Sequence, residues 1–342
     1  MPISLNYIIR RVFLSLFVIL GVVLVTYFII ILSPGDPAVK WAGNPRGPNA
    51  TLAIERARVE LGLDKPIHIQ IIGFIYNVLT GNLGESIAFK IPVISIIQRN
   101  LIATLELLIF TYAISLPIGI SLGIYSALKR GTWIDGFLQT LGIVLANTPT
   151  FWIGTILFLL LISMGFSPHG RVNLKLAIDT GFTPITGFYL IDSLVQGNLQ
   201  VFYDVFLRMI PPAVAISVYP VGLMIRVVRT LTTEILLEDY VRASIAWGVN
   251  KNIIIRHYVT KAVMPGVIQI CGLAFAYSLI DAMVIETAIY GREGLGTLLI
   301  TSLQYSDFRL AIALIIVVTV FYLVVNTIAD LIQAIIDPRV KL

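Results

Sequence analysis

The feature that most constrains this chain is a set of six stretches without aspartate, glutamate, lysine or arginine. Each is long enough, or nearly so, to cross the roughly 30 Å hydrocarbon core of a bilayer as a helix. A spanning stretch must be helical, because backbone amides and carbonyls cannot stay unpaired in lipid. We therefore predict an all-α integral membrane protein with six transmembrane helices, over residues 12–32, 107–128, 137–164, 209–225, 262–280 and 310–329.

The fourth of these stretches is the shortest, and it holds Pro211, Pro212 and Pro220. Each proline removes a backbone donor and strains the helix around it. Neighbouring helices must then pair the carbonyls that are freed. We expect this span to be kinked.

The composition argues against a soluble or nucleic-acid-binding protein. Hydrophobic residues make up 57% of the chain and charged residues 13%, and the mean hydropathy is +0.91, far from the values of soluble domains. The net charge of +5 does not indicate a nucleic-acid partner, because the basic residues are spread through the loops. A single cysteine, Cys271, excludes an intrachain disulfide.

Motifs for catalysis or cofactor binding are missing from the sequence. The chain has no Gly-Lys pair and hence no phosphate-binding loop of the G-x-x-x-x-G-K-[ST] type. His68, His169 and His257 are far apart and have no carboxylate or thiol at metal-ligand spacing. We expect neither enzyme activity nor a cofactor or metal in this chain, so that any ATP and magnesium would be bound by partner subunits.

Basic residues at the ends of the apolar stretches predict the orientation in the cell membrane. Short cytoplasmic loops and helix flanks are enriched in lysine and arginine, whereas long external segments translocate regardless of charge. We therefore expect both termini in the cytoplasm. The inner side would then carry Arg10 and Arg11, Lys129 and Arg130, the 226–261 loop, and a tail with Arg339 and Lys341.

The order of these features divides the chain into three parts. Residues 1–32 form the N-terminal segment and first span, residues 33–100 an external cap, and residues 101–342 the core. In the cap, we predict a helix over 51–61 that stops at Gly62 and Pro66. The core carries a second external insertion, 165–207, and a cytoplasmic loop, 226–265. In the second insertion, the apolar stretch 185–195 is broken by Asp192 and favours an interfacial or re-entrant segment.

The cytoplasmic loop contains a short helix pattern, which begins after Asp239 and runs over 240–247. Gly248 follows at the position of a left-handed cap. Tyr240, Ala243 and Trp247 share one side of this helix, and Arg242 lies one turn from Ala246. Two interpretations fit this pattern: a helix on the membrane surface with its aromatic residues at headgroup depth, or a docking element for a soluble partner.

The segment EDYVRASIAWGV and the later Pro265 resemble the EAA loop of ABC-importer permeases of the oligopeptide/dipeptide/nickel family, in its first-permease branch. The resemblance runs the length of the chain through motifs in family order: SPGDP at 33–37, ELGLDKP at 60–66, GNLGES at 81–86, ATLEL at 103–107, NTPTFWIG at 147–154, ITGFYLIDSL at 185–194, ETAIYGREGLG at 286–296 and NTIADLIQAIIDPR at 326–339.

This resemblance implies a type I importer permease with six membrane helices and a cytoplasmic coupling helix. Such a subunit pairs with a second homologous permease, two cytoplasmic ATPases and an external solute-binding protein. The family imports di- and oligopeptides, nickel chelates and oligosaccharides, and the cargo of this chain is left open. The implied ATPase-coupling residues are Glu238, Asp239, Tyr240, Arg242, Ala243, Ala246, Trp247, Gly248 and Pro265, and Arg226 and Arg229 are expected to carry the motion upward.

The sequence departs from the family in the coupling helix. Where Arg-Ala-Lys-Gly is usual, the chain reads Ile245-Ala246-Trp247-Gly248, and Glu293 stands where a proline is common. The docking surface is therefore more apolar than in relatives. We hypothesise that Trp247 fills a hydrophobic groove on the partner ATPase.

Polar residues within the apolar spans are candidates for the translocation path, because charge in hydrocarbon is costly and faces a cavity or a partner. The candidates are Asp281, Glu286, Asn326 and Asp330. Glu286, Asn326, Asp330 and also Glu106 match family motifs and could instead hold helices together. Asp281 stands where the family carries small residues, which makes it the preferred path residue.

Two other classes are weaker alternatives on the sequence. A secondary transporter or channel would show paired repeats and broken helices, and would leave the basic cytoplasmic loop unexplained. A structural membrane scaffold would not account for the external insertions.

Overall fold

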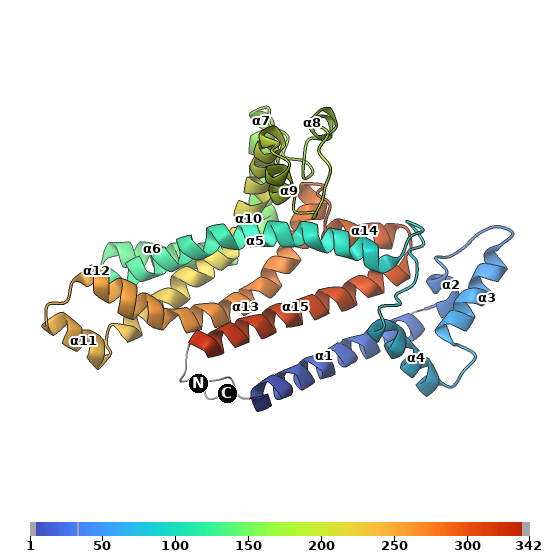
Figure 1. Ribbon diagram of the computed structural model, residues 1–342, viewed down its shortest axis with the longest axis horizontal. Helices are drawn as coiled ribbons and strands as arrows, with labels where there is room; N and C mark the ends of the chain where they lie inside the picture. Colours follow the sequence, from blue (N-terminus) through green and yellow to red (C-terminus); the bar gives the residue numbers. More distant parts are fainter. Residues whose placement is uncertain (1–4, 33, 337–342) are drawn as a thin grey trace. The chain divides into compact units, whose positions relative to one another are not determined.

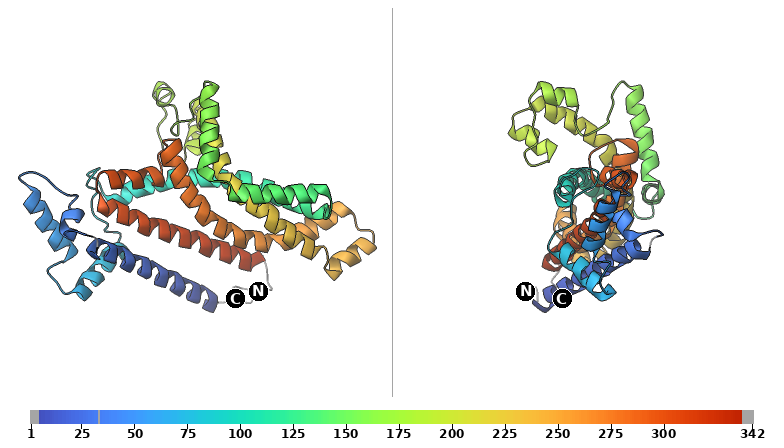
Figure 2. Two further views of the ribbon diagram at one scale, coloured as in Figure 1. Left: turned by 180° about the vertical axis from the view of Figure 1, so that it is seen from behind. Right: turned by 90° about the vertical axis from the view of Figure 1, so that its right-hand side faces the viewer.

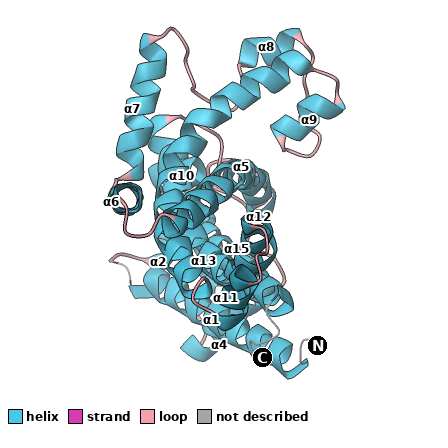
Figure 3. Ribbon diagram, turned by 90° about the vertical axis from the view of Figure 1, so that its left-hand side faces the viewer, coloured by secondary structure: helices cyan, strands magenta, loops and turns pink. Residues whose placement is uncertain are grey.

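The computed structural model describes residues 5–32 and 34–336, and their regular structure is helical apart from an isolated bridge between Glu85 and Pro92. Figure 1 labels the helices, and Figure 3 shows them joined by loops. The chain divides into two compact units, which are described separately. The core unit comprises residues 104–292 and 325–336, and the cap unit comprises residues 5–103 and 293–324.

Four helical segments are long and apolar enough to cross a membrane. They are α5 (Val93–Leu128), α10 (Leu199–Ile235), the continuous run Lys251–Ile289, and α15 (Phe308–Ile336). A bent pair, α6 (Trp133–Asn147) and α7 (Thr150–Ser163), adds a fifth candidate if the two helices act as one span. The described residues thus hold four or five candidate spans, where the sequence predicted six.

The third predicted span is not one straight helix. α6 and α7 are bent by 91° at the break between them, and Figure 2 shows the two green helices meeting at this corner. The break follows from Pro149, which has no backbone N–H and forces the preceding residue out of the helical region. Thr148 accordingly has extended backbone angles, with φ −79° and ψ 128°.

The first predicted span lies in α1 (Leu5–Leu32). Within α1, the structure describes an uninterrupted apolar run over Phe13–Ile29.

In the core unit, α10 is the central helix. It packs against α6, α7, α9 and α13, and 67% of its apolar stretch is buried, compared with 39% for the Lys251–Ile289 run. Pro211, Pro212 and Pro220 all lie inside it. Two glycines allow it to approach α6 closely: a methyl group added to Gly222 would lie 2.5 Å from the backbone nitrogen of Ala146 and 2.6 Å from the carbonyl oxygen of Gly142. Small residues permit such crossings in membranes.

In the cap unit, three helices of the first insertion pack on α1 and on the start of α15. These are α2 (Pro37–Trp41), α3 (Ala50–Leu61) and α4 (Ile67–Leu79). The helix predicted over 51–61 is confirmed as α3, and Gly62 caps it with a φ of 65°. The buried core of this unit is formed by Val23, Ala38, Trp41, Ala57, Leu61, Ile312 and Ile316.

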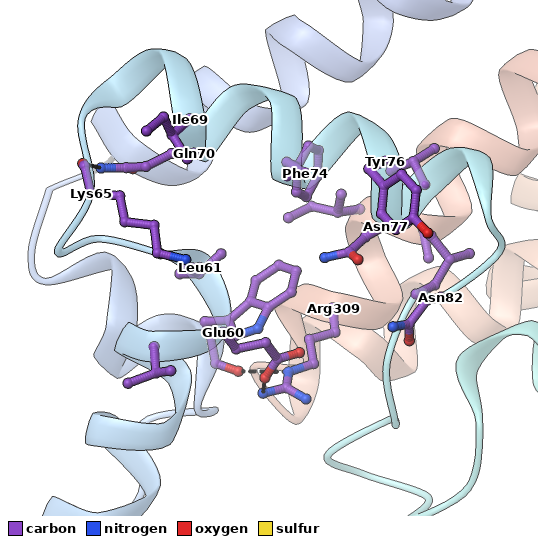
Figure 4. A pocket seen from close by; sticks show the side chains of 18 of the residues that line it. Glu60, Leu61, Lys65, Ile69, Gln70, Phe74, Tyr76, Asn77, Asn82 and Arg309 are labelled. Carbon is purple, nitrogen blue, oxygen red and sulfur yellow. Dashed lines mark hydrogen bonds and ion pairs between the residues drawn. The ribbon is translucent and has the colours of Figure 1, made fainter.

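A cavity of about 270 Å³ lies between α3, α4 and the start of α15. Arg309 donates to Glu60 at 2.6 Å and to the carbonyl oxygen of Trp41 at 3.2 Å along its wall (Figure 4). On another wall, Gln70 donates to the Lys65 carbonyl at 2.7 Å. The Arg309 bonds tie α15 to α2 and α3, whereas the Gln70 bond closes the turn before α4.

The second insertion forms α8 (Leu174–Asp179) and α9 (Tyr189–Val195), and α10 already begins at Leu199. Asp192, which interrupted the apolar stretch, is 1% exposed. Its carboxylate accepts from the backbone N–H groups of Ile185, Thr186 and Gly187 and from the Thr186 hydroxyl, at 2.7–3.2 Å. Asp192 therefore organises the turn before α9.

Two apolar helices were not predicted from the sequence. α4 follows Pro66 directly, and α14 (Leu295–Gln304) follows Gly294. Both are too short to give the long apolar signal of a span.

Candidate functional site

The predicted coupling segment contains the expected short helix, and the long helices on either side of it extend further into the segment than predicted. α10 extends to Ile235, α11 covers Asp239–Ala246, and the chain becomes helical again in α12 (Lys251–Ile253). A π-helical turn, η1 (Ile254–Val259), then leads without interruption into α13 (Thr260–Val284). Figure 1 shows α11 and α12 beyond the ends of α10 and α13.

The position of α11 differs by one residue from the prediction. Glu238 is the N-cap and Asp239 lies in the first turn, whereas Trp247 is the C-cap. Neither acidic side chain caps the helix with a hydrogen bond, so the start is set by backbone geometry and by the favourable charge of Asp239 near the N-terminus. Gly248 has a φ of 75°, which confirms the expected left-handed cap.

One face of α11 anchors the helix to the core unit. Val241 is fully buried and packs in a cluster with Ile254, Val259 and Val263. The Ser244 hydroxyl is satisfied within the helix, since it donates to the Tyr240 carbonyl at 2.8 Å. The hydrophobic cluster therefore fixes α11 against η1 and α13.

The other face of α11 carries most of the predicted coupling residues. Ala243 is half-buried, and the exposed residues are Glu238, Asp239, Tyr240, Arg242, Ala246, Trp247 and Gly248. Trp247 is 84% exposed, which is unusual for a large apolar side chain. The rings of Tyr240 and Tyr258 pack against each other in a tilted arrangement, with 6.2 Å between their centroids. This face has no cover within the described chain.

Pro265 lies inside α13 and is half-buried. The helical run that holds it already starts at Lys251, so the chain has entered this helix well before the proline. Asn250 sets that start, because its side-chain oxygen accepts from the backbone N–H of Asn252 at 2.9 Å.

Arg229 on α10 binds Asp135 at the start of α6. The Asp135 carboxylate also accepts from the Ser126 hydroxyl at 2.7 Å and from the Gly131 backbone N–H at 3.1 Å. The end of α10 that leads into the coupling segment is thereby tied to the tight turn after α5.

Asp281 lies on α13 opposite the break between α6 and α7. The Thr150 hydroxyl, at the first residue of α7, donates to its Oδ2 at 2.8 Å. The side chain of Asp281 remains partly exposed.

Glu286 has different surroundings, since it is fully buried in the π-helical turn η2 (Ile285–Ile289). It accepts from the Thr104 hydroxyl of α5 at 2.8 Å. Its burial and its hydrogen bond to a second helix fit the alternative role given above for Glu286, in which it holds helices together.

Glu106 forms a buried ion pair with Arg171 of the second insertion, with 2.8 Å between Oε2 and Nη2 and side-chain exposures of 4% and 3%. Its other oxygen accepts from the Leu190 backbone N–H at 2.8 Å. The Arg171 guanidinium lies 3.5 Å from the Tyr189 ring centroid. The second insertion is thus fastened to α5 through one carboxylate.

Asn326 and Asp330 are one turn apart on α15, and both are half-buried. The Asn326 side-chain oxygen packs directly on Gly272 of α13, where a methyl group would lie 2.6 Å from it. The observed position of the Asn326 side chain therefore requires a glycine at position 272 of the facing helix.

Several residues of this network were not found from the sequence. Arg171 and Arg208 lie outside the quoted motifs, and Thr150, although within NTPTFWIG at 147–154, has no partner indicated by that motif. Arg208 donates to Asp204 at 2.9 Å and to the carbonyl oxygens of Ser167 and His169. One general signal was available: arginines inside a mostly apolar segment require partners.

These features define a multi-pass, all-helical membrane protein in which a short helix is anchored by one face and exposed on the other. The chain belongs to the family of binding-protein-dependent transport system inner membrane components, which it matches over residues 119–342. Residues 4–108 match the N-terminal part of binding-protein-dependent transport system membrane components. It is therefore a transport subunit of the inner-membrane permease class, and not an enzyme, as predicted.

Curated relatives match over nearly the full length. The chain is 35% identical to the probable D,D-dipeptide transport system permease protein of Escherichia coli K12, over 94% of each chain. It is 33% identical to the dipeptide transport system permease protein of the same organism, over 98% of this chain and 99% of the relative. It is 32% identical to the di/tripeptide transport system permease protein of Pseudomonas aeruginosa UCBPP-PA14, over 98% and 99%.

Proposed function

We propose that this chain is the permease subunit of an ATP-driven importer for di- and oligopeptides. It would form half of the translocation pathway together with a second, homologous permease. Two cytoplasmic ATPases would bind ATP and magnesium, and an external solute-binding protein would deliver the peptide. The membrane helices would be six, counting α1 and the bent α6–α7 pair as one span each, with both termini in the cytoplasm. The tail with Arg339 and Lys341 lies outside the described residues.

The observation that carries this proposal is the two-faced α11. Val241 is buried in the core unit while Trp247 and Tyr240 are exposed, so a force applied to the exposed face would be transmitted through the anchored face to α13. The coupling residues are Glu238, Asp239, Tyr240, Arg242, Ala243, Ala246, Trp247, Gly248 and Pro265. ATP binding would draw the ATPases together and shift the membrane bundle between its inward and outward states.

The peptide cargo is supported by the names of the relatives, which are dipeptide and di/tripeptide permeases. Oligosaccharides or nickel chelates carried by the same class of importer are the alternative. Of the path residues, we favour Asp281 because it is only half-buried and stands where the family carries small residues, whereas Glu286 is fully buried. Asn326 and Asp330 are half-buried as well, but they match family motifs and Asn326 packs on Gly272 of the facing helix.

The test is uptake by the complete complex, reconstituted in proteoliposomes with its ATPases inside and its binding protein outside. We expect accumulation of radiolabelled L-alanyl-L-alanine that requires ATP and the binding protein. Maltotriose and a nickel–histidine chelate serve as the competing cargoes. ATP-driven uptake of either of these, without uptake of the dipeptide, would overturn the peptide assignment.

A further inference from the structure

We propose that Asp281 and Tyr277 of α13, together with Tyr219 of α10 and Thr150 of α7, form a subsite for an ammonium group of the transported solute. We call these four residues the α13 subsite. The inference rests on the proposed peptide importer and adds the chemical group that the pathway recognises.

Three helices bring the α13 subsite together in the core unit. Tyr277 and Asp281 are four residues apart on α13 and therefore share one side of it. The rings of Tyr219 and Tyr277 lie 5.2 Å apart between centroids at an interplanar angle of 45°. Tyr219 joins the group through this contact with Tyr277, and Thr150 donates to the Asp281 carboxylate at 2.8 Å.

The α13 subsite lies on an open face of its helix. Tyr277 is 52% exposed, and the neighbouring exposed residues on this face are Leu273, Ile280 and Val284. A carboxylate facing hydrocarbon is costly, so a face that carries Asp281 is expected to line a polar pathway or meet a polar partner. Tyrosine hydroxyls and rings suit the same wet, confined setting.

The carboxylate has unused capacity for a cation. Its Oδ2 accepts from Thr150, but within residues 5–32 and 34–336 no donor reaches Oδ1, and no lysine, arginine or histidine of that part of the chain pairs with Asp281. An ammonium group brings up to three N–H donors and a full positive charge. One donor can bind Oδ1, while the faces of the tyrosine rings attract the cation.

A metal ion fits this arrangement less well than an ammonium group. The described residues contain no group of three or more histidine, cysteine, aspartate or glutamate side chains that could hold one. A single carboxylate on the same helix face as an aromatic pair is instead suited to an organic cation, which the ring faces also attract. Peptides supply such a cation at their amino terminus and on lysine side chains.

The experiment compares peptides that differ only in this group, using the reconstituted complex. Uptake of L-alanyl-L-alanine is measured against uptake of N-acetyl-L-alanyl-L-alanine, and L-alanyl-L-lysine and its N-acetyl form separate the amino terminus from a lysine side chain. In the wild type we expect preference for the free amine. In Asp281→Asn we expect this preference to fall by about tenfold or more, because a charged hydrogen bond is lost.

Matched variants separate recognition from folding. Tyr277→Phe should keep most of the preference and Tyr277→Leu should lower it, because only the first retains an aromatic ring. Asp179→Asn, at an exposed carboxylate on α8, should leave the preference unchanged. ATPase activity of each complex reports assembly, and if Asp281→Asn does not assemble, Asp281→Glu and the two Tyr277 variants decide the question.

Failure of the proposed function looks different from failure of this inference. If the wild type imports no peptide of either kind, the importer assignment falls. If it imports both kinds and Asp281→Asn leaves their ratio unchanged, or lowers both equally, then the α13 subsite does not recognise the ammonium group. Loss of the preference in Asp281→Asn and Tyr277→Leu, with ATPase activity retained, supports it.

Discussion

Arg229 of α10 and Asp135 of α6 face each other in a two-point ion pair, in which Nε donates to Oδ1 at 3.1 Å and Nη2 to Oδ2 at 2.8 Å. This fork geometry is specific to arginine and a carboxylate. The Asp135 side chain is buried and that of Arg229 is about a quarter exposed, at 8% and 26%. The pair fixes the angle between two helices at the end where the coupling segment leaves α10.

We expect Asp135→Asn and Arg229→Met to destabilise the purified protein by about 1–3 kcal/mol each, because each leaves one partner of a largely buried pair without its counter-charge. The double variant should cost less than the sum of the two. Thermal unfolding in detergent across this double-mutant cycle measures the coupling. Arg130→Gln, at an exposed arginine in the same turn, is the control, and strict additivity of the two substitutions would contradict the ion pair.

The Glu106–Arg171 pair should hold the second insertion in place. Glu106→Gln leaves the Arg171 charge buried, so we expect a loss of roughly 2 kcal/mol or more. The effect should be local, with faster hydrogen exchange at the Leu190 amide, which donates to the same carboxylate. Lys175→Gln, an exposed change in α8, should leave that amide protected. Unchanged exchange at Leu190 in Glu106→Gln would show that the insertion is held by other contacts.

The turn before α9 should loosen in acid. Burial alone would raise the pKa of Asp192, but hydrogen bonds from the Thr186 hydroxyl and from the amides of Thr186, Ile185 and Gly187 outweigh it and lower the pKa. The stabilisation is therefore complete above the ordinary aspartate pKa of about 4 and is lost as the pH falls through the lowered value.

Hydrogen exchange of those amides measures this, with Asp192→Asn as the comparison at each pH. The wild type should be better protected at neutral pH, and the difference should shrink on acidification. A difference that stays constant would assign the protection to backbone packing.

The sequence predicted the parts of this architecture that depend on uninterrupted patterns. Charge-free stretches located α5, α10, α13 and α15, and Gly62 and Gly248 marked helix ends because a left-handed backbone favours glycine. The third span was predicted as one helix because a hydropathy profile does not detect a sharp bend between two apolar helices. Pro149 carried the missing information, since it prevents Thr148 from remaining helical.

The candidate sites, too, could be predicted from the sequence only where the pattern that encodes them is local. Local spacing was enough to identify α11 and its exposed aromatic residues, apart from a shift of one residue at each end. The bonds from Thr150 to Asp281 and from Arg171 to Glu106 join residues 131 and 65 positions apart. No local pattern encodes such pairs, because they depend on how the helices cross.

The crossing of α6 and α10 should tolerate no side chain at Gly222. Gly222→Ala places a methyl group 2.5 Å from the Ala146 backbone nitrogen, so the helices must separate, and we expect a loss of about 1–3 kcal/mol by thermal unfolding. Gly136→Ala, on the facing helix α6, is the control because its added methyl group meets nothing within 4 Å. That change should be neutral or stabilise by about 0.5–1 kcal/mol. Equal behaviour of the two variants would contradict the close crossing.

Substituting Trp247 should weaken assembly of the permease with its ATPase and should not affect folding of the permease itself. Its side chain is 84% exposed, so Trp247→Ala should change the stability of the isolated subunit by no more than about 0.5 kcal/mol. If the indole fills a groove on the partner ATPase, the same change should weaken ATPase binding by about 2 kcal/mol or more, or roughly thirtyfold. Trp247→Lys, which restores the residue type usual in the resembling family, should also weaken it, because the groove expected here is apolar.

Pull-down of the ATPase by the detergent-solubilised permease measures that affinity, and proteoliposome uptake measures its consequence. Trp133→Ala is the matched control, since Trp133 is likewise exposed, at 78%, but begins α6 outside the coupling segment. It should bind the ATPase as the wild type does. Full ATPase binding and uptake in Trp247→Lys would show that the indole is not seated in a groove. The coupling contact would then rest on Tyr240 and Arg242 on the same exposed helix.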